Sequence, residues 1–257
     1  MELLFNTELA KEYKSKAQIA RVLSENWVKS NSFCPYCGHD FLNQYENNKP
    51  VADFFCPACG RIFELKSQRE KISGIINDGA YRTMIERILS NENPDFFFLS
   101  YSKEHHSVNN YFVVPKHFFV PEIIIKRKPL SENARRANWI GCNINLNAIP
   151  AEGRIYIVKD QTEIPKEQVL HQFSKTAFLG ESSIESRGWI LDVMRCVNRI
   201  SVSEFSLNDV YRFEDELQLL HADNHNIRAK IRQQLQKLRD VEYIDFLGNG
   251  RYKKRSV

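Results

Sequence analysis

The sequence predicts an α/β protein of two domains: an amino-terminal α/β domain with an embedded four-cysteine zinc ribbon, and a carboxy-terminal winged helix-turn-helix domain. Two Cys-x2-Cys pairs lie in the first quarter, short apolar runs alternate with helical stripes beyond them, and the last part reads as three helices and a basic hairpin. At 257 residues the chain is long for one compact domain and suits two, which we place at 1–182 and 183–257.

The amino-terminal domain is predicted to mix helices and strands. Apolar residues at helical spacing predict helices, and short runs of β-branched and aromatic residues predict strands. The expected helices cover 7–29, 78–89 and 168–173, and the expected strands cover 49–55, 61–66, 96–101, 111–114, 123–125 and 154–158. A knuckle is expected at 32–40.

The carboxy-terminal domain is predicted to begin its first helix near Gly188. The expected helices cover 189–200, 205–220 and 226–239, and the expected strands cover 243–246 and 251–254. Ser206 is the predicted N-cap of the second helix, and a Gly-Asn-Gly turn joins the two strands. Three helices and a basic hairpin form a winged helix-turn-helix.

Composition and charge limit the classes of molecule that the protein can be expected to bind. Hydrophobic residues make up 42% of the chain and aromatic residues 12%, which supplies enough apolar surface for a folded core. The net charge is only +4, but residues 225–257 hold nine Lys and Arg against three Asp and Glu. A basic tail on a nearly neutral body indicates a module that binds a polyanion.

The sequence carries no signal for export or membrane insertion. The amino terminus has no basic segment followed by an apolar stretch, and no run approaches about eighteen apolar residues. We therefore expect a soluble, cytoplasmic protein without a membrane partner, and a monomer in solution. Six cysteines in that setting are better explained by metal than by disulfides, with Cys142 and Cys196 as isolated, reduced thiols.

Four cysteines have the spacing of a zinc ribbon: Cys34-x2-Cys37 and, 18 residues later, Cys56-x2-Cys59. Each pair places two thiolates at the separation that one tetrahedral ion needs. Gly38 and Gly60 directly follow the pairs and permit a tight backbone that brings amide groups toward the sulfurs. Four thiolates leave no position for water, so the Zn²⁺ is expected to be structural.

The second cysteine pair lies between an acid, Asp53, and an acid-x-Lys triplet, Glu64-Leu65-Lys66. Successive strand residues point to opposite faces, so Glu64 and Lys66 share one face and Asp53 can face them from the preceding strand. Two carboxylates suit Mg²⁺, which also binds substrate phosphate. The metal would polarise a scissile phosphate and acidify a water, while Lys66 would orient or deprotonate that water and offset transition-state charge.

An acid-x-Lys triplet by itself is also common on solvated strands. Here Phe63 and Leu65 predict a half-buried strand, an acid lies upstream, and a zinc turn joins the two strands. These features favour cleavage of phosphodiester bonds. We expect Asp53, Glu64 and Lys66 to be catalytic, and Asp53, Glu64 and Leu65 to be the Mg²⁺ ligands.

These residues resemble the PD-(D/E)xK nuclease motif, with the proline displaced, because Pro50 lies three residues before Asp53. The chain as a whole resembles the DpnI-type restriction endonucleases, which cut adenine-methylated GATC. The stretches that carry this resemblance are 46–53, 63–67, 77–81, 134–144 and 230–240.

The resemblance implies a methyl-directed type II endonuclease acting on adenine-methylated double-stranded DNA. It implies a Mg²⁺-dependent PD-(D/E)xK domain with structural Zn²⁺, and a winged-helix domain, both of which engage the methylated site. Methyl dependence and the target GATC rest on the resemblance alone. One active site per chain leaves open whether one chain nicks both strands in turn or two chains act together.

The third helix of the carboxy-terminal domain has an apolar and a polar face. The apolar face carries Ile227, Ile231, Leu235 and Leu238; the opposite face carries Ala229, Arg232, Gln233 and Gln236, flanked by Arg228. Glutamine can pair with N6 and N7 of adenine, and Ala229 can contact an N6-methyl. A solvated face is the alternative, which the basic hairpin beside it disfavours. The hairpin of the strands expected at 243–246 and 251–254 is the wing of this domain. Its residues Asn249 and Arg251 are expected to contact the DNA backbone.

A second expected DNA contact lies at Arg135, Arg136 and Trp139. A tryptophan exposed among arginines could stack or wedge at the base pairs and sense the methyl groups by shape. Tryptophan is more often a core residue, and the family resemblance is what favours DNA contact here.

Two other functions fit part of the sequence. A zinc-containing winged-helix transcription regulator without catalytic activity would explain the carboxy-terminal domain, but it leaves the combination of Asp53, Glu64 and Lys66 without a purpose. A nuclease acting on RNA or on repair intermediates would use the same residues on another substrate.

Overall fold

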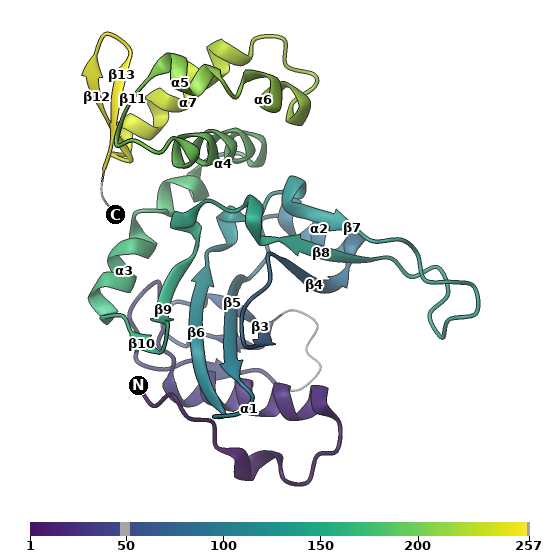
Figure 1. The fold of residues 1–257 in the computed structure, drawn as a ribbon. Coiled ribbons are helices and arrows are strands. Elements are labelled where there is room, and N and C mark those ends of the chain that lie inside the picture. Colours follow the sequence, from purple (N-terminus) through teal and green to yellow (C-terminus); the bar gives the residue numbers. More distant parts are fainter. Residues whose placement is uncertain (47–51, 256–257) are drawn as a thin grey trace. The chain divides into compact units, whose positions relative to one another are not determined.

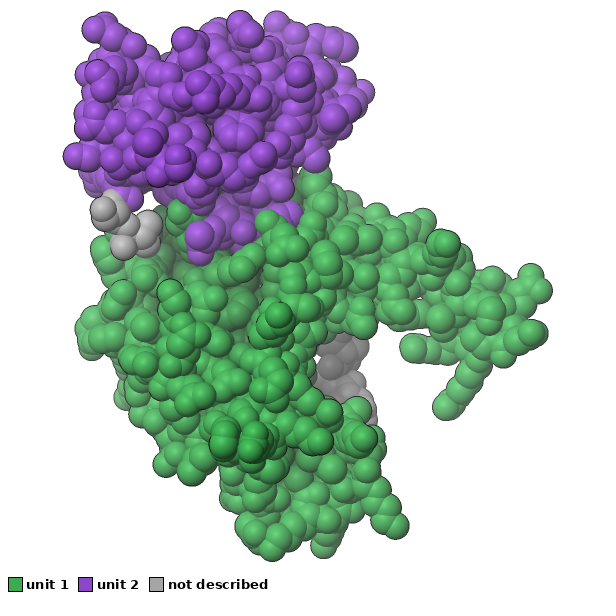
Figure 2. All heavy atoms as spheres, viewed as in Figure 1, with its two compact units in different colours: residues 1–147, 152–177 green, residues 148–151, 178–257 purple. Residues whose placement is uncertain are grey.

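The structure is a computed structural model that describes residues 1–46 and 52–255. Residues 49–51 of the strand expected at 49–55, Pro50 among them, lie outside the described residues. The chain forms two compact units, residues 1–147 with 152–177 (unit 1) and residues 148–151 with 178–257 (unit 2), coloured separately in Figure 2. No helix of the described chain is long and apolar enough to cross a membrane.

Unit 1 is built on a seven-stranded mixed sheet of order β1-β2-β3-β5-β6-β9-β10 (Figure 1). Its strands are β1 (Asn43–Gln44), β2 (Phe54–Phe55), β3 (Ile62–Arg69), β5 (Asp95–Ser102), β6 (Ser107–Val114), β9 (Ile155–Lys159) and β10 (Thr162–Glu163). β3 and β5 are parallel, and the other neighbours are antiparallel. The α/β prediction for this part of the chain is confirmed.

One face of the large sheet forms the main core. Alternate strand residues such as Phe63, Phe97 and Tyr111 point to this face, where the Phe63 and Phe97 rings stack with centroids 4.7 Å apart. Helices α1 (Lys16–Asn31) and α3 (Lys166–Ser174) cover it with their apolar residues. Trp27 of α1 meets Tyr111 edge to face at 5.2 Å, so burial of large aromatic side chains holds helix and sheet together.

The opposite face of the sheet carries Glu64 and Lys66. In the strand register Lys66 pairs with Phe98, Phe98 with Phe112, and Phe112 with Tyr156. An aromatic row therefore crosses this face from β5 to β9, beginning beside Lys66 of β3.

A second sheet of unit 1 has the order β4-β8-β7 and packs with helix α2. These elements are β4 (Ile75–Ala80), α2 (Tyr81–Leu89), β7 (Ile124–Lys126) and β8 (Gly141–Asn145). The helix expected at 78–89 is therefore too long, because Ile76 is buried in a pair with Ile144, and this pairing extends the strand to Ala80. Residues 127–140 join β7 to β8 as an arm that projects beyond both strands (Figure 1).

The described residues of unit 2 form four α-helices and a three-stranded sheet of order β11-β13-β12. The elements are α4 (Ile184–Arg199), β11 (Glu204–Ser206), α5 (Leu207–Tyr211), α6 (Glu214–Leu220), α7 (Ile227–Asp240), β12 (Ile244–Gly248) and β13 (Arg251–Lys254). Gly188 lies inside α4 and does not start it. The helix expected at 205–220 is two helices, and Ser206 caps the first in a capping box with Asp209.

Candidate active site and metal centre

The four cysteines predicted to bind zinc lie together in unit 1. Their Sγ atoms are all within 4.8 Å of one another, and the distances Cys34–Cys59 and Cys37–Cys56 are 3.7 and 3.6 Å. A tetrahedral ion with Zn–S bonds of about 2.3 Å needs sulfurs roughly 3.8 Å apart, so the cluster could hold zinc. In the described ranges it is the only group of three or more Cys, His, Asp or Glu side chains this close.

The backbone of the knuckles suits thiolate ligands. Gly38 and Gly60 have φ of +76° and +73°, a backbone conformation that residues other than glycine rarely adopt. The tight backbone predicted after each cysteine pair is therefore present. Burial raises the pKa of the Cys56 thiol, but backbone amides of Cys59 and Ala58 donate to its sulfur and outweigh burial, so the pKa is lowered. The thiolate is therefore favoured at Cys56, whereas burial raises the pKa of Cys59 to about 11 and also raises the pKa of Cys34.

The second knuckle forms the connection between β2 and β3. Asp53 directly precedes β2, and its N–H donates to the carbonyl of Phe63 at 2.9 Å. Its side-chain Oδ2 accepts a hydrogen bond from the N–H of Leu65 at 2.6 Å. Asp53 is therefore tied to β3 by both its backbone and its carboxylate, and a metal held by the knuckle would brace the same hairpin.

A cluster of opposite charges lies beside this hairpin. The Nζ of Lys66 is 2.6 Å from Oε1 of Glu64 and 2.5 Å from Oδ1 of Asp78. The Asp78 side chain is only 7% exposed, compared with 19% for Lys66 and 23% for Glu64. The structure thus brings Glu64 and Lys66 together on one face, as strand alternation predicted, and adds an aspartate from the other sheet.

Burial sets the direction of the pKa shifts of the two carboxyls, whereas ion pairing sets that of Lys66. It raises the pKa of Asp53 although the Leu65 amide opposes it, and it raises the pKa of Glu64 against the opposing effect of Lys66. Burial lowers the pKa of the Lys66 ammonium, but Glu64 and Asp78 outweigh this and hold the pKa above its ordinary value. The site therefore combines a protonated lysine with carboxylates that are costly to ionise without a further cation.

The donor set fits a hard divalent ion. Mg²⁺ takes one or two protein carboxylates and completes its shell with water and substrate phosphate, and Asp53 and Glu64 can supply such carboxylates. Leu65 can contribute only its backbone carbonyl oxygen. The Nζ of Lys66 already occupies one oxygen of Glu64, which leaves the other for a metal.

Two acidic residues near the site were not predicted from the sequence. Asp78 reaches Lys66 from β4; the sequence places it at the start of the helix expected at 78–89 and within the resemblance stretch 77–81, but neither gives it a role in the site. Glu25 of α1 has a pKa raised first by burial and further by the charge of Asp53, and it accepts a hydrogen bond from Gln44 at 2.9 Å. Nothing in the sequence around Glu25 indicates this proximity.

The predicted reading face of α7 is exposed in the structure. The residues on it, all exposed, are Arg228, Ala229, Arg232, Gln233 and Gln236; those of the apolar face, all buried, are Ile227, Ile231, Leu235 and Leu238. Two of the arginines already have partners in the protein: Arg228 pairs with Glu214 at 2.7 Å, and Arg232 donates to the hydroxyl of Tyr211 at 2.7 Å. DNA contact by this face stays a prediction.

The wing and the arm present the remaining predicted residues. Asn249 lies at the exposed hairpin tip with φ of +49°, and Arg251 is 3.4 Å from Glu204. In the arm, Arg135 and Arg136 are exposed and Trp139 is partly exposed, with the Arg136 guanidinium 4.4 Å from the centroid of its ring. Trp139 is therefore not a core residue, and its contact with DNA stays a prediction.

Comparison with known protein families gives the class of the chain. The model of the DpnI family, described as the Dam-replacing family, matches residues 1–182, and the model of the Dam-replacing HTH domain matches residues 185–254. These matches define a nuclease that acts on DNA and carries a carboxy-terminal helix-turn-helix domain. The chain belongs to the Dam-replacing family, so the resemblance seen in its sequence is confirmed. The regulator without catalytic activity is not favoured.

Proposed function

We propose that the chain is a methyl-directed type II restriction endonuclease that hydrolyses double-stranded DNA at adenine-methylated GATC sites. The observation that carries this proposal is the cluster of Asp53, Glu64 and Lys66 on a hairpin whose connection contributes to the cysteine cluster. Membership of the family supports it. We assign catalysis to residues 1–182 and recognition by the winged helix to residues 183–257.

Asp53, Glu64 and the carbonyl oxygen of Leu65 would hold Mg²⁺, which polarises the scissile phosphate and acidifies a bound water. The cysteine cluster would hold a structural Zn²⁺ that keeps β2 and β3 in register.

Lys66 acts as a cation in this proposal. Its ammonium lies between two carboxylates, and this arrangement favours retention of the proton. In that form it orients the attacking water and a phosphate oxygen, and it offsets negative charge that develops in the transition state. Asp78 is a positioning residue, because it holds the lysine through a second ion pair from β4 of the other sheet. Hydrolysis breaks one P–O bond and adds the elements of water across it, leaving a phosphate monoester and a hydroxyl group.

Recognition is assigned to α7, the wing and the arm. Gln233 and Gln236 would contact base edges, and Ala229 would contact the methyl group of the adenine. Arg228, Arg232, Asn249 and Arg251 would bind backbone phosphates, while Arg135, Arg136 and Trp139 of the arm would approach the same site from unit 1.

The test is digestion of one plasmid prepared with and without adenine methylation, with and without Mg²⁺. We expect cutting of the methylated plasmid only, at GATC, and only with Mg²⁺. Cutting of both plasmids would contradict methyl dependence, and cutting of neither would contradict the nuclease assignment. Glu64→Gln is the matched control, because it keeps the size of the side chain and removes the charge that would bind the metal.

A further inference from the structure

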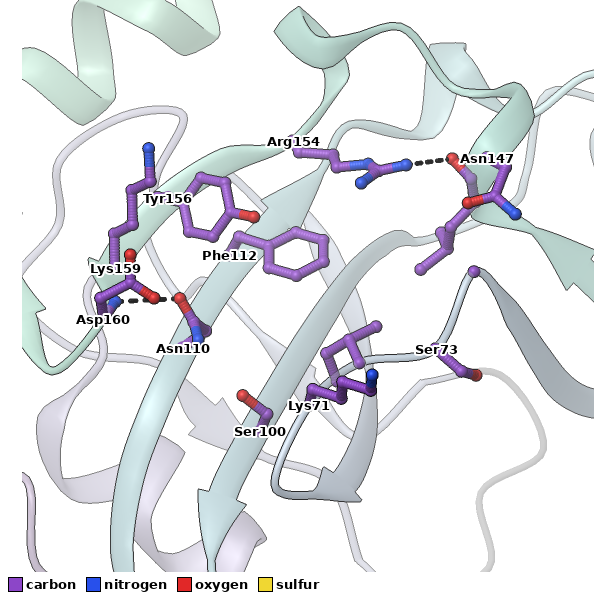
Figure 3. Close-up of a pocket in the computed structure, with 13 residues that line it drawn as sticks. Lys71, Ser73, Ser100, Asn110, Phe112, Asn147, Arg154, Tyr156, Lys159 and Asp160 are labelled. Atoms are coloured by element: carbon purple, nitrogen blue, oxygen red, sulfur yellow. Dashed lines mark hydrogen bonds between the residues drawn. The ribbon is translucent and has the colours of Figure 1, made fainter.

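A cavity of about 260 Å³ lies in unit 1, and its lining does not include Glu64, Lys66 or Asp78 (Figure 3). Phe112 and Tyr156 form part of its wall, with ring centroids 5.1 Å apart. Both rings belong to the aromatic row that begins beside Lys66, so the cavity lies on the same face of the large sheet. None of the residues proposed above for catalysis or DNA recognition lines it.

Two buried donors in the cavity have no partner among the described residues. Ser100 is fully buried, and its hydroxyl makes no hydrogen bond. The Nε of Arg154 is likewise buried without a partner, while its Nη2 is fixed by the carbonyl of Leu146 at 2.6 Å (Figure 3). Buried donors without acceptors cost free energy, so the two groups are arranged for an acceptor that enters the cavity.

The charge of the lining favours an anion. Lys71, Arg154 and Lys159 line the cavity, and its lining contains one carboxylate, that of Asp160. Within the described part of the chain no ion pair engages any of these three cations. The Nζ of Lys159 lies 5.5 Å from the centroid of the Tyr156 ring, which places a cation at the edge of the aromatic wall.

We propose that this cavity binds the phosphate group of a nucleotide. Ser100 and Arg154 donate to the phosphate oxygens, Lys71 and Lys159 supply charge at the mouth, and the ring of Tyr156 lies against the sugar or base. The volume is slightly below the roughly 300 Å³ at which pockets for larger ligands begin, which suits one nucleotide unit.

The cavity lies next to the segment that joins the two strands carrying Lys66 and Asp78. Its rim contains residues 71–74, which join β3 with Lys66 to β4 with Asp78. Neighbouring strands lie about 4.8 Å apart, so Phe112, two strands from Lys66 in register, is roughly 10 Å from it. The nucleotide can therefore be free, or it can belong to a DNA strand that runs across the sheet.

Isothermal titration calorimetry of the full chain without added Mg²⁺ tests the site with inorganic phosphate, 5′-dAMP and deoxyadenosine. We expect phosphate and 5′-dAMP to bind and deoxyadenosine to fail. Ser100→Ala, and Lys71→Ala combined with Lys159→Ala, should each weaken binding at least about fivefold, because each removes hydrogen bonds to a charged group. The Ser100 hydroxyl makes no hydrogen bond to the described residues, so its removal should leave the melting temperature unchanged.

Two controls locate the binding. Lys14→Ala removes an exposed lysine outside the cavity and should leave the affinity unchanged. Lys66→Ala disables the proposed catalytic cluster and should also retain binding of 5′-dAMP, so the cavity is tested independently of the nuclease assignment. Loss of binding in Lys66→Ala with none in Ser100→Ala would overturn the proposal. So would a lack of binding by phosphate and 5′-dAMP at about 10 mM.

The source of the phosphate follows from competition. The titration with 5′-dAMP is repeated with saturating unmethylated duplex DNA. Displacement of 5′-dAMP would support a backbone phosphate of the DNA as the occupant. Retention of 5′-dAMP would support a free nucleotide bound beside the DNA.

Discussion

Asp53 has two separable tasks, and a pair of substitutions distinguishes them. Its carboxylate is a proposed metal ligand, and its Oδ2 also accepts the N–H of Leu65 at 2.6 Å. Asp53→Asn keeps an oxygen at nearly the same place but removes the charge. Asp53→Ala removes both the charge and the hydrogen-bond acceptor. We expect both variants to lose cleavage, and only the alanine variant to lose substantial stability.

The size of the stability difference follows from the contact. A buried N–H left without an acceptor costs about 1–3 kcal/mol. For a folding unit of this size each kcal/mol shifts the melting temperature by roughly 2–4 °C, so Asp53→Ala should melt about 2–12 °C below Asp53→Asn.

The pH dependence of the free energy of unfolding gives a second test of Asp53, and its direction can be predicted. Burial raises the folded-state pKa of Asp53 above its ordinary value of 3.8, so ionisation is less favourable in the folded protein than in the unfolded chain. Ionisation of Asp53 therefore lowers the free energy of unfolding as the pH rises through the interval between the unfolded and folded pKa values. We expect Asp53→Asn to be more stable than the wild type at neutral pH without Mg²⁺, and the difference to vanish below pH 3.8.

Differential scanning calorimetry of the three proteins at several pH values, with a cleavage assay alongside, makes the comparison. Adding Mg²⁺ should stabilise the wild type more than Asp53→Asn, since only the wild type keeps the full ligand set. Cleavage by Asp53→Asn would contradict its role as a metal ligand, and equal melting temperatures of the alanine and asparagine variants would contradict the role of its hydrogen bond to Leu65.

Three further predictions concern other parts of the molecule. Asp78→Asn should lower the cleavage rate with little change in substrate affinity and should move the pKa of Lys66 down, which NMR of the lysine side chain would detect; an unchanged rate would remove Asp78 from the site. Cys59→Ser should reduce bound zinc, measured by elemental analysis, and should lower both stability and cleavage; full cleavage without zinc would contradict a bracing role. Gln233→Ala should reduce discrimination among bases by about 1–3 kcal/mol in binding assays, whereas a uniform loss across sequences would indicate a backbone contact.

The zinc cluster and the β3 strand could be predicted from the sequence because their determinants are local. The spacing within each cysteine pair and the glycine after it are enough to define a knuckle, and the Sγ distances agree with it. Alternation around Glu64 and Lys66 is likewise local, and strand geometry then places both side chains on one face.

The third member of the charged cluster could not be predicted, because its position depends on pairing between distant strands. Asp78 lies on β4, which is placed by its register with β8 and not by its own propensity. The apolar spacing of the local sequence instead predicts that a helix starts at Asp78. The proximity of Glu25 to Asp53 arises in the same way, from packing of α1 against the large sheet. The helix expected to start at residue 205 starts at Leu207 instead, because β11 takes Phe205 and Ser206 into its pairing with β13.

We propose that Asp53, Glu64 and Lys66 cleave DNA, while α7, the wing and the arm bind it. The most direct measurement is the single-turnover cleavage rate of a methylated duplex by Glu64→Gln at a protein concentration that saturates binding. The claim predicts that the rate falls to background, while zinc content, melting behaviour and affinity for the methylated duplex remain as in the wild type. A Glu64→Gln protein that binds and cuts the duplex at the wild-type rate would contradict it.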